Sequence, residues 1–136
     1  MVHNNQIDRD GKPHWEHTER VASKMPTAFL ATCAYLHDVL EDTNVSKEDL
    51  ACLFGWNVVH VVDLLSHRES DSWRQYIERV LQSPSSVIIK IADIEDNLAR
   101  ADEKMEARRA MYEYTLFELK EIKEKYDIFF LSESCT

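Results

Sequence analysis

The sequence predicts an all-α fold, and three observations lead to that prediction. Its 136 residues include only two glycines and three prolines, fewer than a β-rich fold of this length needs for its turns. Apolar residues recur at helical spacing through most of the chain. Ser83-Pro84 is a clear helix start, because serine is a favoured N-cap and proline is favoured at the first helical position.

The expected helices follow one another without a long linker, and we expect six or seven of them. Their approximate ranges are 14–24, 26–41, 46–55, 58–65, 73–80 with a cap at Ser70 or Asp71, 83–99 and 103–125. The range 83–99 contains a β-branched run that locally favours a strand. Its capping serine and the apolar residues that continue to Leu98 favour a helix instead. Phe29, Cys33, Leu36 and Leu40 are expected to form one buried stripe of the second helix.

Size and composition indicate one compact domain over residues 1–136, since 44% of the residues are hydrophobic. A formal net charge of −9 repels the phosphates of nucleic acids, so no nucleic acid partner is expected. No apolar run approaches the length of a membrane span, and the polar N-terminus is unlike a signal peptide. Cys33 and Cys52 lie in apolar helical patterns and are expected to pack as small hydrophobes. We therefore expect a cytoplasmic protein without membrane contacts; an oligomer is possible but not indicated.

The sharpest chemical feature is His37-Asp38, near the end of an apolar stretch. The side chains of adjacent residues in a helix point about 100° apart. The pair can therefore bind one metal ion only if the ion lies between these two side-chain directions. Glu41 and Asp42 follow one turn later, at a helix C-terminus whose dipole disfavours carboxylates. This arrangement is either a solvated helix end or a cluster that a cation compensates, and we favour the cation.

Asp93 follows six almost wholly apolar residues, so we expect it to be at least partly buried. A buried carboxylate needs a partner, and either a metal ion or Lys90, one turn earlier, would serve. Lys90, Asp93 and Asn97 share one helix face. His17, on the first expected helix, is either an exposed or capping residue or a ligand, and its own surroundings leave both open.

Together and in this order, these segments resemble the HD superfamily. The closest resemblance is to the (p)ppGpp hydrolase domain of bifunctional RelA/SpoT-type alarmone enzymes and to stand-alone small alarmone hydrolases. The matching stretches are residues 2–22 with His17, 36–43 with the letters LHDVLEDT, 54–59 after Phe54-Gly55, and 90–97 with the letters KIADIEDN. Glu41-Asp42-Thr43 is the most specific part, because generic HD proteins lack it. The resemblance covers about residues 2–100.

The resemblance implies a compact all-α bundle with one divalent metal ion, usually Mn²⁺. The implied metal ligands are His17, His37, Asp38 and Asp93. Glu41 and Asp42 would position and activate the attacking water, and Asn97 would lie near the sugar or phosphate of a nucleotide substrate. The most specific function implied is removal of the 3′-pyrophosphate from guanosine 3′,5′-bis(diphosphate). Candidates for holding phosphates are Arg9, Lys12, Arg20 and Lys90.

The chain departs from the family pattern around the expected nucleotide site. Ile94 stands where the family has arginine, Asp96 where it often has histidine, and His14 where it has tyrosine. Arg9 lies between two aspartates, so one cation remains where two are usual. Three alternatives therefore stay open: an HD-type nucleotidase or pyrophosphohydrolase for other nucleotides, a non-catalytic metal-dependent nucleotide-binding protein, and a structural helical protein without metal.

Overall fold

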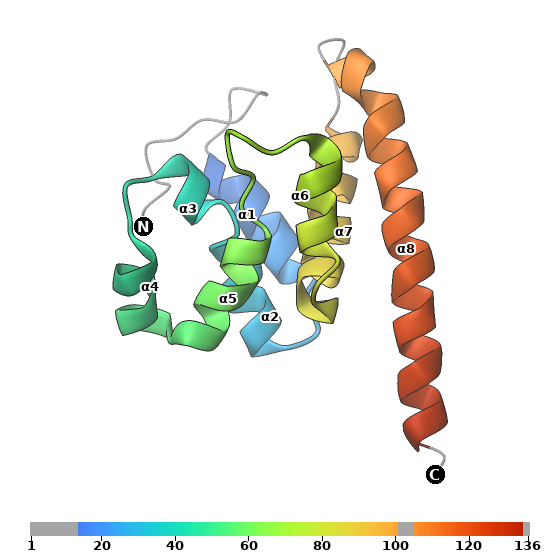
Figure 1. Cartoon of the computed structure of the whole chain (residues 1–136), viewed down its shortest axis with the longest axis horizontal. Coiled ribbons are helices and arrows are strands. Elements are labelled where there is room, and N and C mark those ends of the chain that lie inside the picture. Colours follow the sequence, from blue (N-terminus) through green and yellow to red (C-terminus); the bar gives the residue numbers. More distant parts are fainter. Residues whose placement is uncertain (1–13, 101–104, 135–136) are drawn as a thin grey trace.

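The computed structural model describes residues 14–100 and 105–134. Over these ranges the chain is helical with no strand (Figure 1), which confirms the predicted all-α fold. The helices are α1 (His14–Ser23), α2 (Ala28–Tyr35), α3 (Val39–Asp42), α4 (Lys47–Phe54), α5 (Trp56–Leu64), α6 (Trp73–Val80), α7 (Pro84–Ala99) and α8 (Glu106–Ser134). None of the described helices is both long enough and apolar enough to cross a lipid bilayer.

Helix α7 lies at the centre of the bundle, packed against α1, α2, α5, α6 and α8. Ser83 caps it by accepting a hydrogen bond from the Ser85 N–H, and Pro84 is its first residue, as the sequence predicts. Nine of its sixteen residues are buried, among them the β-branched run that competes for a strand. A helix covered on several sides is apolar around most of its circumference, which explains why this stretch lacks a simple amphipathic pattern.

Helix boundaries marked by capping residues agree with the sequence. Ser46 caps α4, and Gly55 ends it with a φ of +88°, a conformation that glycine adopts without strain. The expected cap of α6 is wrong by one or two residues. The cap is Ser72, whose hydroxyl accepts from the Gln75 N–H while the Gln75 side chain accepts from the Ser72 N–H. This reciprocal pair satisfies two backbone donors, which neither Ser70 nor Asp71 achieves here.

The single helix expected over residues 26–41 is wrong, because the structure breaks it into α2 and α3. Leu36 to Asp38 form a turn between them. His37 Nδ1 lies 2.5 Å from the Ala34 carbonyl oxygen, so the His37 side chain provides a hydrogen-bond donor for a carbonyl at the end of α2. Two side chains expected in the core are exposed instead, Phe29 on α2 and Cys52 on α4, since both face solvent.

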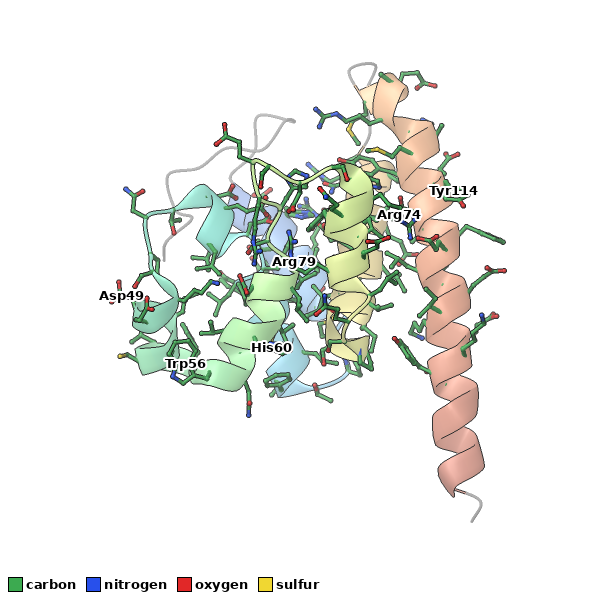
Figure 2. All side chains as sticks on the ribbon, in the orientation of Figure 1. Asp49, Trp56, His60, Arg74, Arg79 and Tyr114 are labelled. Atoms are coloured by element: carbon green, nitrogen blue, oxygen red, sulfur yellow. The ribbon has the colours of Figure 1, made fainter. Side chains whose placement is uncertain are left out.

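Helix α8 packs along α7 and extends past the rest of the bundle at its C-terminal end (Figure 1). It continues to Ser134, well beyond the expected end at Lys125, while its expected start at Glu103 lies outside the described residues. Leu119 is its fully buried anchor against the core. Figure 2 shows Arg74 between α6 and α8, where its Nη1 lies 3.1 Å from Glu118 Oε1; Tyr114 is exposed.

Candidate functional site

Imidazole and carboxylate groups from three parts of the chain converge beside α7. His17 on α1 places Nε2 2.7 Å from Asp93 Oδ1 on α7. His37 places Nε2 3.2 Å from the same oxygen and 3.3 Å from Asp38 Oδ2. One donor atom each of His17, His37 and Asp93 lies within 4.8 Å of the others, and all three residues are buried. The structure thus brings together the four residues that the resemblance implies as ligands.

The turn between α2 and α3 allows His37 and Asp38 to point to the same place. In a continuous helix these neighbours would diverge by about 100°. Here Leu36 has φ −98° and ψ 2°, and Asp38 has φ −100° and ψ −1°. These angles lie near the bridge region, which is sparsely populated and is often occupied by active-site residues. The break in the helix therefore removes the geometric objection to a shared site.

The hydrogen bonds of the two rings fix which nitrogens face the cluster. His17 Nδ1 lies 2.6 Å from Asp96 Oδ2, and His37 Nδ1 faces the Ala34 carbonyl oxygen. A carbonyl oxygen only accepts, so His37 Nδ1 carries a proton and donates it. His17 has a carboxylate at each ring nitrogen, and in the tautomer with the proton on Nδ1 both Nε2 atoms direct a lone pair at Asp93 Oδ1. Two nitrogen lone pairs and a carboxylate oxygen repel one another unless a proton or a metal cation lies among them. The residues present thus fit a metal ion with mixed imidazole and carboxylate ligands.

The pKa values of the cluster show the same preference for positive charge. Burial opposes a charge on His37, but the carboxylates of Asp38 and Asp93 outweigh it and raise its pKa to about 10. Burial also opposes a charge on His17, but the hydrogen bond that it donates to Asp93 raises its pKa above the ordinary value. Burial alone would raise the pKa of Asp93, yet Lys90 and His37 hold it well below the usual range. Asp93 is thus a buried anion.

Lys90 takes the second oxygen of Asp93, with Nζ 2.8 Å from Oδ2. The sequence leaves a metal ion and Lys90 as alternative partners of Asp93. The structure allows both, since Oδ2 faces Lys90 and Oδ1 faces the imidazoles. The Lys90 ammonium also lies 4.8 Å from the ring centroid of Tyr76 and 5.8 Å from that of Trp73. Lys90 is buried, so its placement favours a role in holding Asp93 over direct contact with phosphate.

The cluster opens onto a cavity of about 920 Å³. Besides the cluster residues, its polar lining consists of Arg20, Glu41, Asp42, His67, Lys90, Asp96, Asn97, Arg100 and Arg108. Its less polar wall consists of Trp73, Tyr76, Met105, Met111 and Tyr112. A cavity of this volume that mixes acidic, basic and aromatic groups can hold a nucleotide-sized ligand.

The predicted water-activating and substrate residues lie around this cavity as far as the structure describes them. Glu41 and Asp42 on α3 and Asn97 on α7 line it. Desolvation and the neighbouring Asp38 carboxylate raise the pKa of Glu41 to about 7. Arg20 also lines it, bound to Asp96. Two further predicted residues, Arg9 and Lys12, lie outside the described residues.

Several residues that line the cavity are not predicted from the sequence. Asp96 reads in the sequence only as a departure from the family pattern, although it lies one turn after Asp93 on the same helix face. Arg100 continues that face, so helical spacing from Asp93 could have found it. Arg108 comes from α8, and only the packing of α8 on α7 brings it to the cavity. His67 also lines the cavity, although no sequence motif assigns a role to it.

Curated proteins similar to this chain carry names from alarmone metabolism. A GTP pyrophosphokinase of Myxococcus xanthus is 28% identical over an alignment that covers 80% of this chain and 17% of that protein. A guanosine-3′,5′-bis(diphosphate) 3′-pyrophosphohydrolase of Vibrio cholerae is 30% identical, with 71% and 16% covered. The bifunctional (p)ppGpp synthase/hydrolase SpoT of Escherichia coli K12 is 28% identical, with the same coverage. The chain thus spans about a sixth of the length of these relatives.

Among solved structures, a metazoan ortholog of SpoT that hydrolyzes ppGpp has the same fold. The TM-score is 0.72 at 23% identity, and the alignment covers 97% of this chain and 89% of that one. No family model matches the chain. The predicted resemblance is therefore confirmed by individual relatives and by the fold.

Proposed function

We propose that this chain, whose homologues are ppGpp hydrolases and synthetases of the RelA/SpoT type, is a metal-dependent phosphohydrolase that removes the 3′-pyrophosphate from guanosine 3′,5′-bis(diphosphate). The observation that carries the proposal is the convergence of two imidazole nitrogens and a buried carboxylate oxygen at the wall of a nucleotide-sized cavity. The names of the relatives support the substrate, and the fold of the SpoT ortholog supports the scaffold.

His17, His37, Asp38 and Asp93 would hold one divalent ion. Two imidazoles with two carboxylates suit borderline transition ions, and Mn²⁺ is our choice because carboxylate oxygens favour the harder members of that group. When bound, the ion supplies positive charge to a phosphoryl group and lowers the pKa of water. Lys90 keeps Asp93 charged and fixed, since its ammonium lies on the oxygen that faces away from the imidazoles.

Glu41 and Asp42 would handle the proton of the attacking water. They lie on the short helix that begins directly after Asp38, so they reach the same cavity from one turn further along the chain. The raised pKa of Glu41, about 7, suits a group that accepts a proton near neutral pH. Asp42 shares this position at the cavity and would orient the water.

The cations that line the cavity would bind the phosphates of the substrate. We assign this task to Arg100 and Arg108, because both line the cavity that the cluster opens onto. Guanidinium groups bind phosphate through paired N–H donors. Asn97 would add a neutral hydrogen-bonding group near the sugar. Such local positive charge is needed in a chain with a net charge of −9.

The deciding experiment is incubation of the purified chain with Mn²⁺ and a panel of guanosine and adenosine nucleotides, with and without a 3′-pyrophosphate. Chromatography separates the products. We expect pyrophosphate from the 3′ position of guanosine 3′,5′-bis(diphosphate), and none after treatment with a chelator.

One observation favours a second candidate, a nucleotidase for other substrates: Ile94 and Asp96 replace residues that the family pattern has next to the substrate. Release of phosphate only from 5′ positions would support that candidate. Binding without any product would support a non-catalytic nucleotide-binding protein and contradict our proposal.

A further inference from the structure

A buried carboxylate connects the proposed metal site to an arginine at the edge of the cavity. Asp96 on α7 accepts a hydrogen bond from His17 Nδ1 through Oδ2, at 2.6 Å. The same carboxylate accepts two from Arg20, Nε to Oδ1 at 2.7 Å and Nη2 to Oδ2 at 3.0 Å. Asp96 is only 4% exposed, whereas the Arg20 side chain is 31% exposed. Arg20 lies one turn after His17 on α1, so both act on Asp96 from one helix face.

We propose that Asp96, held in place by Arg20, is a positioning residue that fixes the orientation of His17 and increases its affinity for the metal ion. The proposal rests on the proposed function, because it concerns the same metal site. It also reassigns Arg20 from the substrate phosphates to this carboxylate.

The geometry gives Asp96 three effects on His17. A carboxylate at Nδ1 holds the proton there, so Nε2 keeps the lone pair that a metal requires. It restricts rotation of the ring, so Nε2 stays directed at Asp93 Oδ1, 2.7 Å away. It also makes the imidazole a stronger electron donor, because negative charge next to Nδ1 stabilises positive charge on the ring.

Arg20 supplies what Asp96 needs to stay charged while buried. A buried carboxylate needs a cation as its partner, and the Arg20 guanidinium provides one through two hydrogen bonds. The guanidinium group donates to both carboxylate oxygens, so it fixes the orientation of the carboxylate plane and also balances its negative charge.

The arrangement depends on Asp96, a residue at which this chain departs from the family pattern. The position before Asn97 is often histidine in the family, and a histidine there cannot provide an anion. We infer that the chain has a carboxylate–histidine pair at this point, with Arg20 on the adjacent helix as its counter-ion.

The test measures metal affinity in the full chain, without nucleotide. Mn²⁺ binding is followed by the electron paramagnetic resonance of the free ion, and the ligand field by the visible spectrum of Co²⁺ bound to the same site. The variants are Asp96→Asn, which keeps the shape but removes the charge, and Arg20→Lys, which keeps the charge but removes the fork. Glu95→Gln is the matched control, since it removes a carboxylate from the next position of α7, where Glu95 pairs with Lys120 at 3.2 Å.

We expect Asp96→Asn to weaken Mn²⁺ binding by roughly 10- to 100-fold, which is typical when a partner of a metal-bound histidine is lost. The same variant should change the Co²⁺ spectrum. Arg20→Lys should weaken binding a few-fold, and Glu95→Gln should match the wild type. Melting temperatures of the metal-free variants check that the affinities refer to folded protein. If Asp96→Asn does not fold, the more exposed Arg20→Lys variant carries the test.

Two results would overturn the inference. One is wild-type Mn²⁺ affinity in both variants, which would leave Asp96 a purely structural ion pair. The other is a raised KM for nucleotide in Arg20→Lys with unchanged Mn²⁺ affinity, which would return Arg20 to the substrate. Wild-type protein that binds no divalent ion would overturn the metal part of the proposed function as well. A wild type that binds the ion but hydrolyses no nucleotide would leave the inference standing and contradict only the function.

Discussion

We expect different tasks for Asp38 and Glu41: Asp38 as a metal ligand, and Glu41 as the group that accepts the proton of the attacking water. Asp38 Oδ2 lies 3.3 Å from His37 Nε2, inside the cluster of donor atoms. Glu41 lines the cavity three residues later, about 4.5 Å further along the axis of α3. We predict that Asp38→Ala loses the metal and the activity together, whereas Glu41→Gln keeps the metal and the nucleotide affinity and loses turnover.

The structure sets the size of both effects. With both histidines neutral, as metal ligands must be, the cluster contains two carboxylates and the Lys90 ammonium, so its formal charge is −1 without the metal and zero in Asp38→Ala. Two unit charges 4 Å apart attract by about 4 kcal/mol at an effective dielectric constant of about 20. We therefore expect at least about a 100-fold loss of affinity for a divalent ion. Glu41→Gln removes general-base assistance and should lower kcat by roughly 10²- to 10⁴-fold, or about 2.7–5.5 kcal/mol.

The assay combines metal content after gel filtration with steady-state kinetics at saturating Mn²⁺. Asp49→Asn is the control, because Asp49 is an exposed carboxylate on α4 at the outer end of the bundle (Figure 2). The reverse pattern, in which Glu41→Gln empties the site and Asp38→Ala leaves it full, would refute the assignment of the two carboxylates.

Three further predictions concern groups that support the site. Lys90→Met leaves Asp93 buried without its cation and should lower the free energy of unfolding by about 3–5 kcal/mol, which denaturation of metal-free protein with urea measures. Glu41 must be ionised to accept a proton, so kcat should fall as the pH drops through about 7 or somewhat lower in the metal-bound enzyme; a pH profile that keeps this acid limb in Glu41→Gln would contradict the assignment. Leu119→Ala should cost about 2–5 kcal/mol of unfolding free energy, seen as a lower urea midpoint, because Leu119 is fully buried where α8 meets α7.

The sequence predicts the helices well wherever a local signal marks their ends. Ser46, Gly55 and Ser83-Pro84 act within a few residues of themselves, through single hydrogen bonds or backbone angles, so a pattern can identify them. The break between α2 and α3 has no such signal. Residues 36–38 contain neither glycine nor proline, and the turn forms where the His37 side chain binds the Ala34 carbonyl and its Nε2 reaches toward Asp93. Tertiary contacts therefore override helix propensity at this point.

The sequence predicts those site residues that can be recognised by residue type and by their spacing within a short motif. The imidazoles and carboxylates of the cluster come from short motifs, and the structure brings them together. Arg108 depends on how α8 docks on α7, which no local pattern encodes. The sequence predicts Arg20 as a phosphate ligand from its place near a motif, and it could not predict the contact with Asp96, which lies 76 residues away in the sequence.

The charges that line the cavity indicate an order of binding. Among the described lining residues are five carboxylates and four arginines or lysines, a formal charge of −1 with neutral histidines. This lining repels a polyphosphate until a divalent ion changes its formal charge to +1. In the inactive Glu41→Gln variant, which lacks one of these carboxylates, the ion changes the formal charge from zero to +2. We therefore predict that guanosine 3′,5′-bis(diphosphate) binds at least tenfold more weakly to the chelator-treated variant than to the Mn²⁺ form of the same variant, measured by calorimetry. Equal affinity with and without Mn²⁺ would show that the arginines suffice to bind the phosphates, and that the ion serves only the chemical step.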